Sequence, residues 1–172
     1  MVPIAMTLAR RSVLLSGARL LLGGGVAALA ITFARTGAAA PAQHFEVEMT
    51  DDAWKAKLSP RAYAVLRHEA TEAPFTSALL EEHRKGTFTC AGCALALFSS
   101  TTKFESGTGW PSFWQPLPNA VSQQVDRSIG MVRDEVHCRR CGGHLGHVFD
   151  DGPKPTGLRY CMNGVALGFT PA

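Results

Sequence analysis

Five cysteines are the residues of this 172-residue chain that could carry chemistry most directly. Four of them form two pairs with the same C-x-x-C spacing, Cys90 with Cys93 and Cys138 with Cys141, and the fifth, Cys161, stands alone. Two such pairs offer four thiolates at a spacing that a tetrahedral zinc ion accepts. The fifth thiol is then either an inert buried side chain or a reactive group.

The two pairs predict a structural zinc site with one ion per chain. Each pair lets two sulfurs from one tight turn face the same ion, and Gly92, Gly142 and Gly143 favour such turns. Four thiolates close the coordination sphere, so no position remains for water or substrate, and the metal would contribute folding free energy. The alternatives are two disulfides or four unrelated thiols.

Cys161 lies in a segment whose side chains could make its thiol reactive. If this segment is a strand, Arg159, Cys161 and Asn163 project to one face. A cation beside a thiol lowers its pKa, which favours the nucleophilic thiolate, and an amide can hold a polar group nearby. The alternative is a cysteine that only packs, since free cysteine is among the most buried residue types.

Two further groups of residues could complete a site around Cys161. His144 and His147 stand three apart in a glycine-rich segment directly after the second cysteine pair. They could be extra metal ligands, but four sulfurs already fill a zinc ion, so acid–base groups for Cys161 are the other interpretation. Trp110, on a Gly/Pro-rich loop at residues 107–114, could wall a small apolar pocket or anchor the loop.

The first 42 residues have the pattern of an export signal. Arg10 and Arg11 precede apolar residues, and the uncharged run 20–34 is shorter than the roughly 18–20 residues that cross a bilayer. Small residues follow, and we expect cleavage after Ala42. The pattern predicts export to the bacterial periplasm by a twin-arginine-like route; the alternative is a membrane anchor formed by the uncleaved N-terminus.

The remaining residues, 43–172, are enough for one domain. The whole chain has 17 basic and 14 acidic residues, but four basic and no acidic ones lie in residues 1–42, which leaves 13 against 14 and a net charge of −1. Nucleic-acid binding usually requires a basic face. We therefore expect no nucleic-acid partner, and no stable membrane span in the mature form.

The elements that must position these side chains change character at Gly86. Before it, Thr50 and Ser59 are suitable N-caps, and Pro60 suits a first helical position, which predicts short helices up to residue 70. After it, short apolar runs lead into both cysteine pairs and indicate a mainly antiparallel β domain. Strands or strand-like runs are expected at 86–90, 95–98, 131–138, 159–163 and 165–169.

The linked motifs resemble those of one family, the type B methionine sulfoxide reductases, which reduce the R epimer of methionine sulfoxide. The similar stretches span nearly all of residues 45–170 and lie at 58–60, 71–76, 86–93, 98–100, 103–113, 143–149 and 159–163. The resemblance implies a fold of two antiparallel sheets carrying a structural zinc. It also implies oxidised proteins as substrates and a thiol as reductant.

The resemblance further implies a role for each polar candidate. Cys161 would be the nucleophile that attacks the sulfoxide sulfur, leaving methionine and a sulfenic acid on the cysteine. His147 would donate a proton to the sulfoxide oxygen. His144 and Asn163 would orient this histidine or the bound oxygen.

The aromatic candidates and one substitution complete this expectation. Trp110 would present its ring to the substrate's methyl group, and Phe149 would form part of the pocket wall. Many members of the family place a second, resolving cysteine before the tryptophan, where this chain has Thr108. The sulfenic acid on Cys161 would therefore be reduced by an external thiol, such as that of a thioredoxin-like protein.

Two other functions are open at this point. A zinc-ribbon-like binding module would share the four-cysteine site but have no catalysis. A C-x-x-C disulfide oxidoreductase would need an exposed, metal-free pair in a thioredoxin-like βαβ pattern, which the sequence does not show. The near-neutral charge and the grouping of Cys161, His147 and Asn163 favour the reductase.

Overall fold

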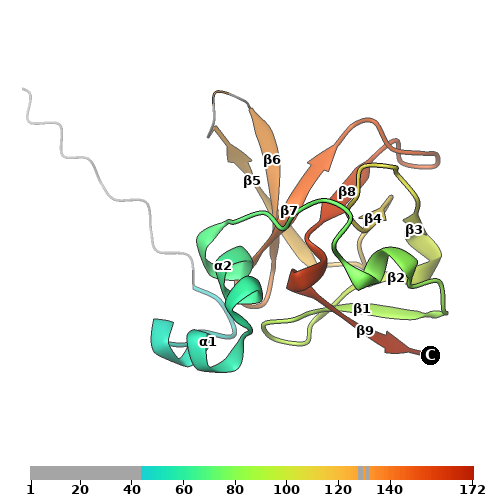
Figure 1. Cartoon of the computed structure of the whole chain (residues 1–172). Helices are drawn as coiled ribbons and strands as arrows, with labels where there is room; N and C mark the ends of the chain where they lie inside the picture. Colours follow the sequence, from blue (N-terminus) through green and yellow to red (C-terminus); the bar gives the residue numbers. More distant parts are fainter. Residues whose placement is uncertain (1–43, 128–129, 131) are drawn as a thin grey trace, which may run out of the picture. The chain divides into compact units, whose positions relative to one another are not determined.

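The computed structural model describes residues 44–172, except 128, 129 and 131 (Figure 1). The export signal predicted for residues 1–42 lies outside the described residues, so this signal and its boundary stay predictions. Among the described residues, no helix is long and apolar enough to cross a membrane.

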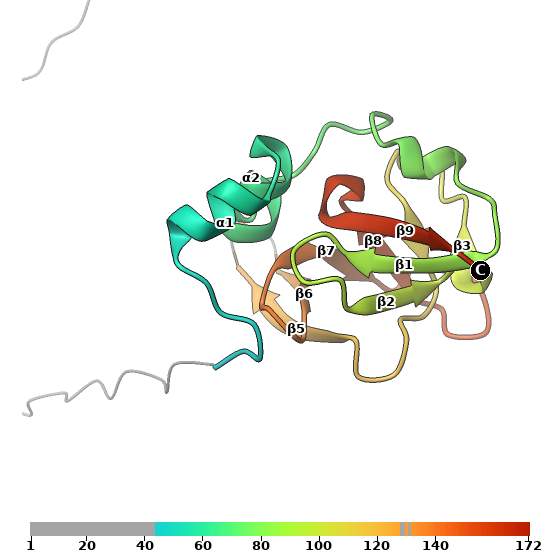
Figure 2. The ribbon, with the colours of Figure 1, turned by 90° about the horizontal axis from the view of Figure 1, so that it is seen from below.

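Two short helices precede the sheets, as the capping residues predict. The side chain of Thr50 caps α1 (Asp51–Lys57), and the side chain of Ser59 caps α2 (Pro60–His68). Helix α2 ends two residues before the expected position because Glu69 adopts the left-handed conformation. Figure 2 shows both helices at one end of the sheets, where α2 contacts β7.

The strands form two antiparallel sheets, which confirms the expected fold class. The three-stranded sheet has the order β2-β1-β9 and contains β1 (Gly86–Cys90), β2 (Ala96–Ser99) and β9 (Leu167–Pro171). The six-stranded sheet has the order β3-β4-β8-β7-β6-β5 and contains β3 (Lys103–Phe104), β4 (Ser112–Phe113), β5 (Val121–Asp126), β6 (Arg133–Cys138), β7 (His144–Phe149) and β8 (Arg159–Met162). Short 3-10 turns connect them, namely η1 (Ala78–Glu81), η2 (Ser100–Thr102) and η4 (Gly164–Ala166).

The sequence prediction missed four strands and misplaced several boundaries by one or two residues, as for β2, expected at 95–98, and β8, expected at 159–163. Strands β3, β4 and β5 were not expected, and β7 lies where a glycine-rich segment was expected. The expected strand at 165–169 instead begins as η4, and β9 starts at Leu167. Strand β7 pairs along both edges, with β6 and β8, so tertiary pairing overrides the low strand propensity of glycine here.

Aromatic side chains join the two sheets. Phe88 and Phe98 come from the three-stranded sheet and pack on Phe113 of the six-stranded sheet, with ring centroids 4.9 Å and 4.3 Å apart. Tyr160 adds a contact with Phe98 at 5.9 Å. All four side chains are buried, and Figure 2 shows the three-stranded sheet lying over β7 and β8.

Candidate functional site

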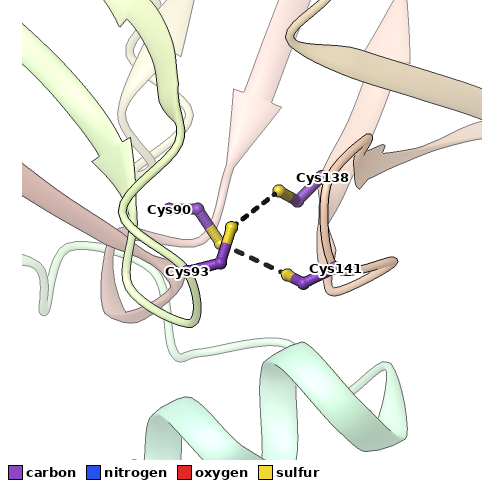
Figure 3. Close-up of side chains that lie close together, drawn as sticks. All are labelled: Cys90, Cys93, Cys138 and Cys141. Atoms are coloured by element: carbon purple, nitrogen blue, oxygen red, sulfur yellow. Dashed lines mark hydrogen bonds between the residues drawn. The ribbon is translucent and has the colours of Figure 1, made fainter. Parts of the chain in front are cut away.

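The four paired cysteines converge on one point, with their side chains facing each other across two turns (Figure 3). The sulfurs of Cys90 and Cys141 are 3.7 Å apart, and those of Cys93 and Cys138 are 3.5 Å apart. A tetrahedral zinc ion with Zn–S bonds of about 2.3 Å requires sulfurs roughly 3.8 Å apart. These distances fit such an ion and are far longer than the roughly 2.05 Å of a disulfide bond.

The chemistry of this cluster also fits a metal. Hydrogen bonds among the thiols lower the pKa of Cys141 and raise those of Cys90 and Cys138, so the cluster favours a thiolate at Cys141 to which its neighbours donate. Gly142 follows in the left-handed conformation (φ 67°), and a Cβ there would collide with the ring of Phe45. The turn after the second pair therefore depends on glycine, as its sequence indicates.

A bulge places His144 and His147 on the same face of β7. In a regular strand, residues three apart point to opposite faces. Here Val136 pairs with Gly146 while the next residue, His137, pairs with His144, so β7 contains one extra residue. The rings of His144 and His147 consequently have centroids only 5.5 Å apart. Sequence spacing alone could not reveal this arrangement.

Cys161 lies directly opposite His147 in the register of β8 and β7. A cavity of about 130 Å³ opens here, and its wall includes Trp110, Phe149 and Asn163 as well as Cys161 and His147. Five of the six expected residues of the reactive site therefore meet in one pocket. The sixth, the buried His144, does not line this cavity, but its ring packs against the ring of His147.

Burial outweighs the predicted effect of Arg159 on Cys161, although the Arg159 charge does lower the pKa of this thiol as expected. Burial raises the pKa of the Cys161 thiol, and the hydrogen bond with Thr108 and the charge of Arg159 offset this only in part. The Thr108 hydroxyl oxygen lies 3.8 Å from the sulfur. Arg159 gives two hydrogen bonds of 2.8 Å to Asp151 and stacks 4.3 Å over Phe149, so its charge is largely neutralised by another partner.

This raised pKa predicts the pH dependence of Cys161 alkylation. The thiolate reacts with iodoacetamide, and a raised pKa leaves less thiolate at neutral pH, so the rate should rise with a midpoint above that of a free cysteine. Peptide mass spectrometry over a pH series measures it. Thr108→Val is the control, and it should move the midpoint still higher. A midpoint below that of a free cysteine would contradict the burial effect.

His147 has a carboxylate partner that the sequence analysis did not identify. Its Nε2 lies 3.0 Å from Oδ2 of Asp126, and the same oxygen accepts a hydrogen bond of 2.6 Å from Arg133. The carboxylate fixes the orientation of the ring. Asp126 and Arg133 are register partners at the ends of β5 and β6, so only strand pairing brings them to His147.

His144 contacts a second carboxylate, that of Glu135, in a fully buried position. Burial lowers the pKa of His144 to about 4 despite this neighbour, so its ring is neutral at pH 7. Burial also raises the pKa of Glu135, but the hydrogen bond from Gln124 and the nearby His137 and His144 lower it by more. Glu135 is therefore a carboxylate, with a histidine on each side.

Asn163 and Trp110 are both tied to one loop residue, Glu72. The Asn163 carbonyl oxygen accepts from the Glu72 backbone N–H at 2.9 Å, and its amide donates to the Leu145 carbonyl at 3.2 Å. The Trp110 indole donates to the Glu72 carbonyl at 3.1 Å. The Glu72 carboxylate accepts from the backbone N–H groups of Gly164 and Val165. This loop thus fixes two walls of the pocket.

Replacing Glu72 by alanine is expected to destabilise the protein by about 1.5–3 kcal/mol, the usual range for hydrogen bonds to a charged group. Two backbone N–H groups at the start of η4 would lose their acceptor. Denaturant unfolding measures the change. Glu81→Ala is the matched control, because that exposed carboxylate should change stability by less than about 0.5 kcal/mol. Equal effects of the two substitutions would contradict this role.

Comparisons with known proteins agree with this site. The family model described as "SelR domain" matches residues 58–171. A "Peptide methionine sulfoxide reductase MsrB" from Leptospira interrogans is 54% identical over 127 residues, which cover 73% of this chain and 97% of that protein. Proteins of the same name from Bradyrhizobium diazoefficiens and Methanosarcina mazei are also 54% identical, over 91% and 90% of their lengths. The chain belongs to the SelR family of type B peptide methionine sulfoxide reductases.

Proposed function

We propose that this protein reduces the R epimer of methionine sulfoxide in oxidised proteins, with Cys161 as the nucleophile. The observation that carries the proposal is the pocket itself. A half-buried thiol lies opposite an imidazole, beside an indole ring, in a cavity of about 130 Å³. That space suits the end of one side chain, and its aromatic walls suit a methyl group.

The reaction follows from the polarity of the sulfoxide. The sulfur is electrophilic, so the Cys161 thiolate attacks it while the oxygen takes up a proton. The oxygen then passes to the cysteine, which becomes a sulfenic acid, and the thioether is released. The sulfoxide sulfur gains two electrons and the cysteine sulfur loses two, so the step balances without another reactant.

His147 is the proton donor in this proposal, and Asp126 is its positioning residue. The carboxylate at 3.0 Å holds the ring in place, and His147 lines the cavity in which negative charge would develop on the sulfoxide oxygen. Asn163 lines the pocket, but both ends of its amide bind main-chain groups, so it acts chiefly by holding the pocket wall. His144 supports the ring of His147 from the buried side.

Activity toward separated epimers tests the proposed function. With dithiothreitol as reductant, the enzyme should reduce peptide-bound methionine R-sulfoxide and leave the S epimer unchanged. The assay is followed by chromatography of the peptide. Reduction of the S epimer alone would overturn the proposal. The binding-module alternative is not favoured, because it gives no reason for a thiol and an imidazole to share a pocket with Trp110.

The recycling step is proposed to use an external thiol, such as that of a thioredoxin-like protein. All five cysteines of the chain lie among the described residues, and four of them form the metal cluster. Thr108, whose hydroxyl contacts the Cys161 sulfur, stands where a resolving cysteine would be expected. A sulfenic acid formed on Cys161 therefore has no spare internal thiol to react with.

Thr108→Cys is expected to create such an internal route. The substituted thiol would lie at contact distance from the sulfenic acid and displace water to form a disulfide. After one turnover without reductant, non-reducing peptide mass spectrometry should detect the disulfide in T108C and only sulfenic acid in the unsubstituted protein. Thr101→Cys, at an exposed and distant threonine, is the control and should give none. A stoichiometric internal disulfide in the unsubstituted protein would contradict the external route.

The four-cysteine cluster is proposed to hold one structural zinc ion. The ion would be bound by Cys90, Cys93, Cys138 and Cys141 and would join the turns that follow β1 and β6. With four thiolate ligands it supplies folding energy and no catalytic position.

We also propose that residues 1–42 direct export to the periplasm, with an uncleaved membrane anchor as the alternative. The twin arginines, the short apolar run and the small residues before position 43 support this.

A further inference from the structure

Strands β6 and β7 carry three close metal-ligating side chains outside the four-cysteine cluster. The donor atoms of Glu135, His137 and His144 all lie within 4.8 Å of one another. Glu135 is 5% exposed and His144 is 2% exposed. Three such groups are costly to bury unless each has a suitable partner.

These donors are close together but are not satisfied by one another. His137 Nε2 lies 3.1 Å from Glu135 Oε2, and His144 Nδ1 lies even closer to Glu135 Oε1. Nevertheless Glu135 Oε1, His137 Nε2 and both ring nitrogens of His144 have no hydrogen-bond partner among the described residues. The nitrogen–oxygen distances are those of ion pairs, but the angles at these atoms are not those of hydrogen bonds.

The tautomer of His137 strengthens this point. Its Nδ1 lies 3.1 Å from the carbonyl oxygen of Gly142, which only accepts hydrogen bonds, so Nδ1 carries the proton. In a neutral ring, Nε2 then presents a lone pair toward the Glu135 carboxylate. Nε2 lies 3.1 Å from Glu135 Oε2 without a hydrogen bond, and a cation bound by both atoms would satisfy them. A histidine N–H donated to a backbone carbonyl is also the usual support of a metal ligand.

We propose that Glu135, His137 and His144 form a second metal site, specific for a divalent transition metal such as Zn²⁺ or Co²⁺. Two imidazoles and one carboxylate suit these ions and not Mg²⁺ or Ca²⁺, which prefer oxygen ligands. Ligands about 2.0–2.1 Å from a metal lie roughly 2.9–3.4 Å apart, and the nitrogen–oxygen distance of 3.1 Å falls in this range. Three protein ligands leave a position open for water.

The site has its own access and supporting contact. A cavity of about 280 Å³ has His137 and Gln124 in its wall, and it is separate from the cavity that contains Cys161. The Gln124 amide donates to Glu135 Oε2 at 3.1 Å, which orients the carboxylate. An ion could therefore reach His137 without passing through the reactive pocket. This metal site and the reactive pocket are adjacent, because the ring of His144 packs against the ring of His147.

Cobalt titration of the full-length protein with zinc already bound at its four cysteines tests this site. A second metal should bind at one equivalent per chain, with weak visible bands and without the intense thiolate charge-transfer absorption that cobalt at four cysteines would give. His137→Gln removes one ligand and should weaken cobalt binding at least 10-fold. His83→Gln, at an exposed histidine, is the matched control and should change the affinity less than twofold.

Each result has a definite meaning. A protein that holds one metal per chain under these conditions overturns the site, as does equal cobalt affinity in H137Q and H83Q. Either outcome would leave His137 as a direct neighbour of Glu135 without a metal between them. If H137Q does not fold, cobalt broadening of histidine ring signals in the unsubstituted protein decides: broadening of both His137 and His144 supports the site, and broadening confined to other histidines overturns it.

Discussion

Replacing Cys161 by serine is expected to abolish reduction of methionine R-sulfoxide. A serine hydroxyl has the same position but is a poor nucleophile at neutral pH, and it cannot accept the oxygen to form a sulfenic acid. Removing a nucleophile of this kind usually lowers turnover at least about 10³-fold. The measurement is turnover of a peptide that contains the R epimer, with dithiothreitol in excess.

The fold and the metal should survive this substitution. Cys161 is only half-buried and lies apart from the four clustered cysteines, so C161S should keep one zinc per chain and its unfolding midpoint. Met162→Leu is the matched control, because Met162 is next to Cys161 in the chain, its own side chain faces the core, and the change conserves volume. M162L should retain turnover. If C161S kept more than about one hundredth of the activity, another group would have to be the nucleophile.

Local sequence signals predict the two helices and the two strands that lead into cysteine pairs. Thr50 and Ser59 predict the start of both helices, since a capping hydroxyl acts on the residues directly after it. The short runs that lead into Cys90 and Cys138 predict β1 and β6, because the strand pattern is also contained in neighbouring residues. Strand β7 could not be predicted in this way, because its central glycine, Gly146, is tolerated only through pairing with β6 and β8.

The same distinction applies to the reactive site. Cys161, His147 and Trp110 were identified because their motifs are specific, and the structure places them around one cavity. Asp126 and Glu135 were missed, although both lie beside the expected histidines. They carry no motif of their own, and their roles come from the register of β5 and β6, which a single sequence does not specify.

Removal of the proposed structural zinc ion is expected to have the largest effect on stability. The sheets are joined by an aromatic core, but the turns after β1 and β6 are joined through the cysteine cluster. Structural zinc sites contribute about 10–16 kcal/mol of apparent binding free energy, whereas a domain of this size is stable by only about 5–15 kcal/mol in total. Cys138→Ser should therefore lose zinc and be largely unfolded at 25 °C.

Metal analysis combined with circular dichroism measures both parts of this expectation. C138S should contain less than about one zinc per ten chains and lack a cooperative thermal transition, because a three-thiolate site binds the ion too weakly to compensate the folding entropy. C161S is the matched control, since it removes a thiol outside the cluster. If chelation left the unsubstituted protein folded with an unchanged midpoint, the cysteine cluster would not support the fold, and the packing of Phe98 on Phe113 would have to be sufficient.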